Sequence, residues 1–334
     1  MGPIASGRFE PVTSGRTDDP AGAVPSRRIA HGNPRGRDPL VTALRTRKDP
    51  SMKFGIMFAN AGPFGAAEGL VHLAQTAESV GVESLWTVEH VIVPKGYESK
   101  YPYSHDGKMP GTEDSPIPDP YVWMSYAAAV TKTIHLASGI IILPQRHPFY
   151  VAKEAATLDQ LSGGRHILGV GVGWLQEEFD ALKVPFEKRG AITDESIQAL
   201  RDLWSKGTSK HDGDYYKWGE VESNPKPVSG SVPIVIGGHT KAAARRAARL
   251  GDGFFPARAD TLETCLAELK AECDAIGRDP GEIEITTGSA PTPDEVKRLE
   301  DMGVSRFIVP PPGFTPDQVS AGLEKLGNEL ISKF

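Results

Sequence analysis

From residue 52 onward, short apolar segments alternate eight times with segments of helical periodicity, and this alternation limits the possible folds most strongly. In the helical segments, apolar residues recur every three or four positions, as on the buried face of a helix. Short apolar strands between helices are typical of a buried parallel sheet. We therefore predict an α/β fold, a (β/α)8 TIM barrel, with a doubly wound open sheet as the structural alternative. The predicted strands are residues 53–58, 84–88, 134–143, 166–171, 232–236, 253–257, 284–287 and 306–309.

Two connections are longer than a plain barrel requires, so we expect insertions after strands 2 and 4. Residues 94–118 follow the second strand and are rich in Pro, Gly and Tyr. A connection of this length is typical of a functional loop. Residues 210–227 contain Asp212-Gly213 between polar and aromatic residues, a pattern that indicates a hairpin.

Residues 1–51 differ in composition from the remainder of the chain. They are rich in Gly, Pro, Arg and Ser and show no apolar periodicity, so we predict a disordered leader. Met52 directly precedes the first strand, and we interpret it as the functional start of a single domain, residues 52–334. Arg27-Arg28 is not followed by an apolar segment, so an export signal is not expected.

Charge and composition exclude several classes of protein. The formal net charge is -6 without a clustered basic stripe, which argues against nucleic-acid binding. No apolar run approaches the roughly 20 residues of a membrane span, and no metal-ligand spacing is present. Cys265 and Cys273 fall on one predicted helix, too far apart to be bridged. We therefore expect a cytoplasmic protein without disulfides, metal or membrane contact.

His90 is the first candidate for chemistry, because it follows the second predicted strand. In a TIM barrel, residues at the C-terminal ends of strands form the active site. A histidine donates or accepts a proton near neutral pH, and the adjacent Glu89 could alter its charge state. The alternative is a core histidine bonded to a neighbouring carbonyl group.

Glycines at two other strand ends form the second group of candidates. Gly171 and Gly173 remove side chains where a planar ligand or phosphate could approach the backbone, although their spacing is not the dinucleotide-binding fingerprint. The run Gly237-Gly238-His239-Thr240 precedes a predicted helix, whose N-terminus could hold an anion. The alternative is a tight turn in which Thr240 only caps the helix.

The third predicted strand contains Gly139, and a glycine inside a strand often marks a bulge or a close backbone approach. Arg146 and His147 follow at the mouth of that strand. They could face a substrate, or they could be a solvated pair in a loop.

Four segments in this order resemble the luciferase-like superfamily, specifically its branch that depends on the deazaflavin coenzyme F420. They are Leu85-Trp86-Thr87-Val88-Glu89-His90, residues 155–165 with the sequence AATLDQLSGGR, residues 168–174 with the sequence LGVGVGW, and residues 233–238 with the sequence PIVIGG. The resemblance covers the chain from about Met52 to the C-terminus.

The resemblance implies a barrel with a flavin-like ring at the C-terminal ends of its strands. It implies a non-proline cis peptide bond at Gly139–Ile140 behind the ring and His90 at the reactive edge of the ring. From its place next to His90, we expect Glu89 to set the charge of His90. The resemblance further implies a homodimer that acts on a small organic molecule. The implied contacts with ring, ribityl chain and phosphate are Gly171, Val172, Gly173, Trp174, Gly237, Gly238, His239 and Thr240. We further expect the walls of the substrate pocket to be Phe58, Tyr121, Arg146 and Trp174.

Two departures from the family pattern bear on the coenzyme and the substrate. Related sugar-phosphate dehydrogenases carry a glutamate at the position of Trp174, which argues against that substrate class. Bacterial luciferases carry an arginine for the FMN phosphate near the position of Val172, and its absence favours F420. We therefore expect hydride transfer between F420 and an organic substrate. The alternatives are a monooxygenase that uses reduced FMN and a barrel that binds a coenzyme without catalysis.

Overall fold

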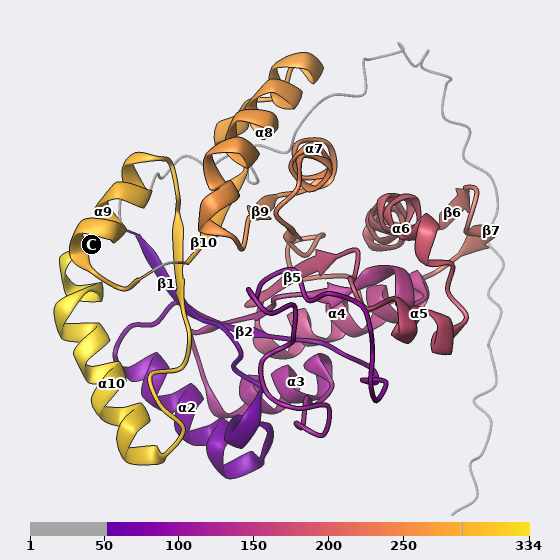
Figure 1. Ribbon diagram of the computed structural model, residues 1–334. Helices are drawn as coiled ribbons and strands as arrows, with labels where there is room; N and C mark the ends of the chain where they lie inside the picture. Colours follow the sequence, from indigo (N-terminus) through magenta and orange to yellow (C-terminus); the bar gives the residue numbers. More distant parts are fainter. Residues whose placement is uncertain (1–51, 289) are drawn as a thin grey trace, which may run out of the picture. The chain divides into compact units, whose positions relative to one another are not determined.

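The computed structural model describes residues 52–288 and 290–334, and its strands form a closed parallel barrel surrounded by helices (Figure 1). The order around the barrel is β3-β2-β1-β11-β10-β9-β8-β5, and β3 also pairs with β5, which closes the ring. This confirms the predicted TIM barrel and excludes the open sheet. The strands are β1 Lys53–Ile56, β2 Ser84–Thr87, β3 His135–Ser138, β5 His166–Gly171, β8 Ile234–Gly237, β9 Gly253–Phe255, β10 Glu284–Thr287 and β11 Arg306–Val309. The prediction for residues 1–51 lies outside the described residues.

Apolar faces of the helices pack against the outside of the barrel, and a smaller apolar cluster around Trp86 fills its interior. Cys265 and Cys273 are both buried and free on α8, as expected. In the described part of the chain, no helix is long and apolar enough to cross a bilayer. The helices are α2 Ala67–Ser79, α3 Pro120–Val130, α4 Pro148–Ser162, α5 Gln176–Leu182, α6 Arg189–Trp204, α7 Lys241–Leu250, α8 Leu262–Ile276, α9 Pro293–Asp301 and α10 Pro316–Glu329. Short 3-10 helices are η1 Gly62–Gly65, η2 Leu143–Gln145, η3 Phe186–Lys188, η4 Ala259–Thr261, η5 Pro280–Glu282 and η6 Ile331–Lys333.

The third predicted strand is interrupted, which corrects the expectation of one strand over residues 134–143. β3 ends at Ser138, and among the described residues the two-residue strand β4, Ile141–Ile142, pairs only with β5. Where the barrel closes, the Ser138 hydroxyl accepts a hydrogen bond from Gly169 N at 2.9 Å and donates one to Gly169 O at 2.8 Å. A Cβ atom on Gly169 would lie 1.9 Å from the Ser138 carbonyl oxygen, so only glycine permits this approach.

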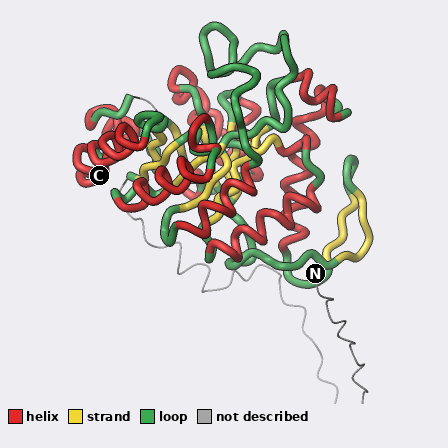
Figure 2. Tube along the Cα trace, turned by 90° about the horizontal axis from the view of Figure 1, so that it is seen from below, coloured by secondary structure: helices red, strands yellow, loops and turns green. Residues whose placement is uncertain are grey.

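The insertion after the fourth barrel strand forms the predicted hairpin, with strands β6 Ser209–Asp212 and β7 Lys217–Val221. Figure 2 shows this two-stranded ribbon at the periphery of the barrel. Its turn is attached to α6 through the carboxylate of Glu195. That carboxylate accepts hydrogen bonds from the backbone nitrogens of Asp214, Tyr215 and Tyr216.

An ion cluster at the N-terminal ends of the strands was not predicted. Arg306 at the start of β11 donates two hydrogen bonds of 2.8 Å to Glu83 and also pairs with Glu284. Burial raises the pKa of Glu83, but the charge and hydrogen bonds of Arg306 outweigh burial and bring that pKa to about 2. The cluster therefore couples strand ends at the bottom of the barrel, opposite the rim that carries the candidate site.

Candidate active site

The parallel register brings the candidate residues to one rim of the barrel. Thr87 pairs with Ser138, Ile142 with Gly171, and Gly237 with Phe255. The segments that follow these strand ends contain His90, the stretch around Ile140, the glycine run after β5 and the run that leads into α7. The prediction that His90 and these glycines share one end of the barrel is confirmed.

Aromatic rings form a connected row across this rim. His90 and Trp174 meet edge to face with ring centroids 5.7 Å apart, and Trp174 meets Tyr101 at 5.2 Å. Tyr101 contacts Tyr103 at 5.3 Å, and Tyr103 contacts His239 at 5.1 Å. The row thus joins β2, β5 and β8 through tyrosines of the long loop after β2. Edge-to-face contacts of this kind are favourable for aromatic pairs.

His90 has a carboxylate partner, but the partner is Glu178 rather than Glu89. Nδ1 of His90 lies 3.0 Å from Oε2 of Glu178, and both side chains are buried. The other oxygen of Glu178 accepts hydrogen bonds from Val91 N at 2.7 Å and Ile92 N at 3.2 Å. A carboxylate that accepts two backbone hydrogen bonds acts as an acceptor towards His90 as well, so Nδ1 carries a proton. Within the described residues, Nε2 of His90 has no hydrogen-bond partner and remains available to a ligand.

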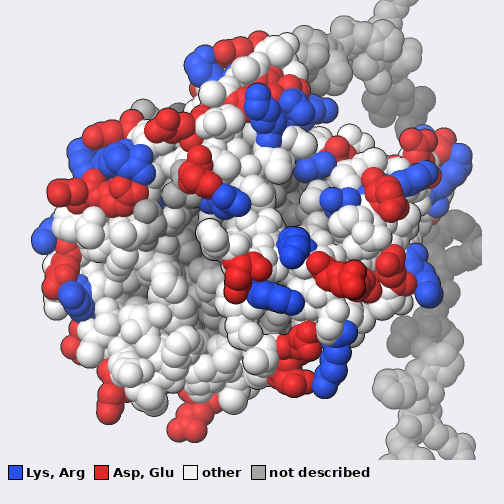
Figure 3. All heavy atoms as spheres, in the orientation of Figure 1, with Lys and Arg blue, Asp and Glu red and all other residues white. Residues whose placement is uncertain are grey.

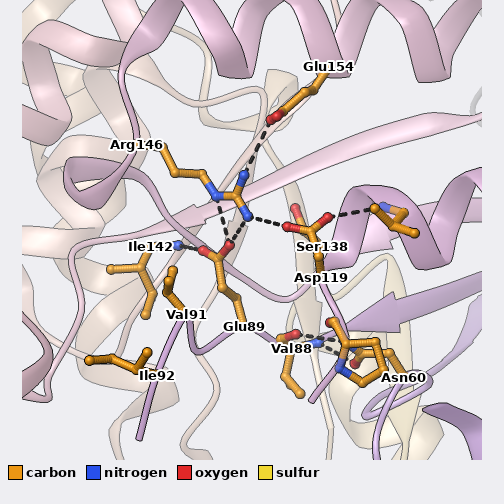
Figure 4. A network of polar contacts seen from close by, with 12 residues as sticks. Asn60, Val88, Glu89, Val91, Ile92, Asp119, Ser138, Ile142, Arg146 and Glu154 are labelled. Atoms are coloured by element: carbon orange, nitrogen blue, oxygen red, sulfur yellow. Dashed lines mark hydrogen bonds and ion pairs between the residues drawn. The ribbon is translucent and has the colours of Figure 1, made fainter. Parts of the chain in front are cut away.

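Glu89 turns towards Arg146, which corrects its predicted role beside His90 (Figure 4). Oε1 of Glu89 accepts a hydrogen bond from Nε of Arg146 at 2.8 Å, and Nη2 of Arg146 lies 2.5 Å from the same oxygen. Oε2 of Glu89 accepts from Ile142 N at 2.5 Å. Arg146 also reaches Asp119 at 2.7 Å and Glu154 at 3.3 Å. The guanidinium group is therefore engaged by three carboxylates rather than facing a substrate.

Arg146 and the carboxylates around it shift one another's pKa values. Burial opposes the charge of Arg146, but Glu89 and Asp119 outweigh burial and raise the pKa of its guanidinium above the ordinary value. Burial also raises the pKa of Glu89, an effect that Arg146 and the Ile142 amide oppose. The net direction is a raised pKa for Glu89, and the permanently charged Arg146 stabilises its carboxylate form against burial.

The predicted pocket walls occupy different surroundings. Tyr121 is 6% exposed and packs against His166 and near Arg146, so it does not line the rim as expected. Phe58 is partly exposed after β1 with a left-handed φ of 58°. Trp174 lies partly exposed in the aromatic row, as a pocket wall would. Buried Asn60 links the segment after β1 to the segment after β2. Its side chain donates a hydrogen bond to Val88 O and accepts one from Val88 N.

Ile140 occupies the space left by two of the candidate glycines. The peptide bond Gly139–Ile140 is cis, as the resemblance implied. A Cβ atom on Gly171 would lie 2.6 Å from Cδ1 of Ile140, and one on Gly237 would lie 2.6 Å from its Cγ2. These glycines therefore admit a protein side chain, which corrects the expectation that their lack of side chains opens the backbone directly to a ligand. Ile140 itself stays partly exposed on the rim.

Gly173 has a similar packing role. A Cβ atom on Gly173 would lie 2.6 Å from the Phe179 ring, and its φ of 83° also favours glycine.

The start of α7 keeps features suited to an anion. Thr240 caps α7 by accepting from Ala243 N at 3.2 Å, as its simpler interpretation predicted. Nδ1 of His239 is buried without a hydrogen-bond partner in the described part of the chain.

The loop after β2 is attached to the first turn of α5. Glu177 accepts hydrogen bonds from Glu98 N at 2.7 Å, Ser99 N at 3.0 Å and the Ser99 hydroxyl at 2.6 Å. Burial alone would raise the pKa of Glu177, but these hydrogen bonds bring it to about 2. Glu177 and Glu178 thus hold neighbouring parts of the same loop. Neither glutamate was predicted as a site residue from the sequence. The sequence feature that could have indicated them is their position shortly after the glycine-rich end of β5.

The loop borders a cavity of about 590 Å³ on the rim side, where Arg258 pairs with Asp260 and donates to Pro102 O at 3.0 Å. The lining residues are Tyr103, Ser104, His105, Ala257, Arg258 and Asp260. On the face shown in Figure 3, acidic and basic side chains are intermingled rather than gathered into a basic patch. Among the described residues, no group of three or more His, Cys, Asp or Glu is placed to hold a metal ion.

Comparison with known proteins supports the resemblance. A family model described as luciferase-like monooxygenase matches residues 52–305. The uncharacterized protein Rv0940c of Mycobacterium tuberculosis is 35% identical over 242 residues, which cover 72% of this chain and 83% of that protein. The F420-dependent glucose-6-phosphate dehydrogenase of Amycolatopsis mediterranei is 32% identical over 201 residues, which cover 59% of this chain and 55% of that protein.

A solved structure gives the same picture of the fold. The monooxygenase RslO1 from Streptomyces bottropensis aligns with a TM-score of 0.67 and 23% identity, over 84% of this chain and 99% of its own. Members of the matched family are oxidoreductases and monooxygenases that depend on F420 or a flavin. The match spans most of the chain, and the chain belongs to the luciferase-like monooxygenase family.

Proposed function

We propose that this enzyme transfers a hydride between coenzyme F420 and a small organic substrate, and that His90 moves the accompanying proton. The observation that carries the proposal is the state of the His90 ring. Glu178 fixes the proton on Nδ1, while Nε2 has no partner in the described part of the chain. A histidine held in one tautomer by a buried carboxylate is suited to proton transfer at its other nitrogen.

The residues on the rim fit a flavin-like coenzyme. Ile140 rests on Gly171 and Gly237 and keeps a partly exposed surface, which offers an apolar platform for a planar ring. Beside it, the start of α7 offers free backbone N–H groups, and the unpartnered Nδ1 of His239 offers a further polar contact. Helix N-termini stabilise phosphate groups. F420 and FMN share both chemical features, so either coenzyme is compatible with these residues.

When bound, F420 supplies a carbon centre that accepts or donates a hydride. For oxidation of an alcohol, Nε2 of His90 accepts the hydroxyl proton as the hydride leaves the carbon atom. For the reverse reaction, the same nitrogen returns the proton to the substrate oxygen. Glu178 stabilises the positively charged ring that exists between these events, because its carboxylate lies 3.0 Å from Nδ1. Trp174 packs edge to face against His90 and so limits the rotation of the His90 imidazole ring.

The choice of F420 is supported by similarity to an F420-dependent dehydrogenase and by the absence of an arginine beside Val172 in the sequence. In the structure, Arg189 from α6 comes close to this segment, but it donates to the carbonyl oxygen of Gly173 at 3.3 Å. The family description, luciferase-like monooxygenase, supports oxygenation with reduced FMN as the alternative, because homologues use F420 or FMN. Anaerobic titration with F420 and with FMN separates the two, and we expect saturation at micromolar concentration with F420 only. Saturation with FMN only would favour the monooxygenase. Binding of F420 without hydride exchange, across a broad panel of carbonyl compounds and alcohols, would favour a non-catalytic barrel.

The role of His90 is tested by His90→Ala. We expect the variant to bind F420 with unchanged affinity and to lose about 100- to 10,000-fold in hydride-transfer rate, the usual contribution of a general acid or base. The measurement is single-turnover absorbance of the coenzyme with the best substrate of the panel. Undiminished transfer would reject the assignment of His90.

A further inference from the structure

We propose that Glu89 and Arg146 are positioning residues that hold the segment Ile140–Ile142 in place as the wall behind the coenzyme ring. The proposal rests on the proposed coenzyme site at the rim. It assigns to this pair neither proton transfer nor substrate binding. The pair acts through the backbone amide of Ile142, which donates to Glu89 at 2.5 Å.

The segment needs an external tether because it is held on one side only. β4 consists of Ile141 and Ile142, and its only strand neighbour among the described residues is β5. β3 has ended at Ser138, so no strand pairs with the other side of β4. The carboxylate of Glu89 takes the place of that missing neighbour by accepting the Ile142 N–H (Figure 4). An unpaired amide in this buried position would be costly.

Glu89 is itself held rigidly. Its side chain is 2% exposed, and both of its oxygens are engaged, one by Ile142 N and the other by Arg146. Arg146 is anchored in turn by Asp119 at the start of α3 and by Glu154 on α4. Through Glu89 and Arg146, the Ile142 amide is therefore held in place by α3 and α4, two helices outside the barrel. Charge-assisted hydrogen bonds are stronger and more directional than neutral ones.

The tether reaches the coenzyme site through Ile140, two residues before Ile142. Its side chain packs against Gly171 of β5 and Gly237 of β8, while part of its surface remains exposed on the rim. A shift of β4 would move the Ile140 side chain out of the space that Gly171 and Gly237 leave by lacking side chains. The depth at which a planar ring rests on the rim would then change.

The variant Glu89→Gln tests this inference, because it keeps the shape of the side chain and removes its charge. We expect faster hydrogen–deuterium exchange at the amides of Ile141 and Ile142 in the coenzyme-free protein, and about tenfold weaker F420 binding, the effect of one weakened charge-assisted hydrogen bond. The Nδ1–H tautomer of His90, followed by ¹⁵N NMR, should stay unchanged because Glu178 determines it.

Asp119→Asn and Glu154→Gln are graded comparisons, since both carboxylates anchor Arg146 without touching Ile142. We expect each to weaken F420 binding less than Glu89→Gln does, because the Glu89–Ile142 hydrogen bond remains. The double variant Glu89→Gln/Arg146→Met should bind F420 no more weakly than the weaker single variant, because the two side chains act as one unit.

Unchanged exchange at Ile141 and Ile142 in Glu89→Gln would overturn the tether. Faster exchange with unchanged F420 affinity would overturn its role in positioning the coenzyme. An altered His90 tautomer would instead assign Glu89 to the proton-transfer site. If the wild-type protein binds neither F420 nor FMN, the proposed function and the coenzyme part of this inference both fail, while the exchange data still decide whether the tether exists.

Discussion

Glu178→Gln provides the sharpest test of the His90 arrangement. Glutamine keeps an oxygen that can accept from Val91 N and Ile92 N, which lie 2.7 and 3.2 Å from the present carboxylate oxygen. Its amide nitrogen would then face Nδ1 of His90 and donate to it. The neutral ring would carry its proton on Nε2, so Nε2 could no longer accept a proton from the substrate.

The size of the effect follows from the contact that is lost. A hydrogen bond to a charged group contributes about 1.5–3 kcal/mol, which corresponds to a loss of about 10- to 150-fold in hydride-transfer rate. Two measurements check this: ¹⁵N NMR of the His90 ring, which should change from the Nδ1–H to the Nε2–H tautomer, and single-turnover kinetics with F420.

Glu177→Gln is the matched control for this experiment. Glu177 lies on the same helix turn and holds Glu98 and Ser99, but it does not contact His90. It should leave the His90 tautomer unchanged. Retention of the Nδ1–H tautomer in Glu178→Gln, together with an unchanged rate, would show that Glu178 does not set the proton position on His90.

Two other changes test the fold around the site. Glu83→Gln should remove about 3 kcal/mol of stability, because Arg306 depresses the pKa of Glu83 from 4.5 to about 2. That stability is present above pH 4.5 and is lost as the pH falls towards 2. Urea unfolding at pH 7 and pH 3 should therefore show a smaller decrease in the free energy of unfolding for the variant than for the wild type. An equal decrease in both proteins would contradict this role of Glu83. Gly237→Ala would place Cβ 2.6 Å from Ile140 and should weaken F420 binding at least about tenfold, whereas Gly219→Ala meets no atom within 4 Å and should bind normally. Equal affinity in both alanine variants would count against Ile140 as the ring platform.

Local periodicity predicted the barrel well because each strand and helix carries its own pattern of apolar residues. Asp119-Pro120 marked the start of α3, where the Asp119 side chain accepts from Val122 N at 3.0 Å. The hairpin after the fourth barrel strand was likewise visible in its turn residues. Gly139 indicated a bulge or close backbone approach in the third predicted strand, but not that β3 ends at Ser138, because the apolar run continues through residues 140–143 without a change of composition.

Side-chain partners were harder to predict, because they depend on contacts between distant segments. Glu89 adjoins His90 in sequence, but the two side chains diverge, and Glu178 reaches His90 from α5 instead. Arg146 looked like a ligand for a substrate, and three carboxylates from separate segments engage it. Gly171 and Gly237 suggested a bare backbone, and only the structure shows Ile140 resting on them. The sequence thus indicated the rim but not how its side chains are paired.

We propose that a deazaflavin ring lies on Ile140 with its reactive edge at Nε2 of His90. A crystal structure of the protein with F420 measures this directly. We expect the ring to cover the exposed surface of Ile140, with Nε2 of His90 within hydrogen-bond reach of a group at the reactive edge. A ring that binds away from Ile140, or that turns its reactive edge away from His90, would contradict the account.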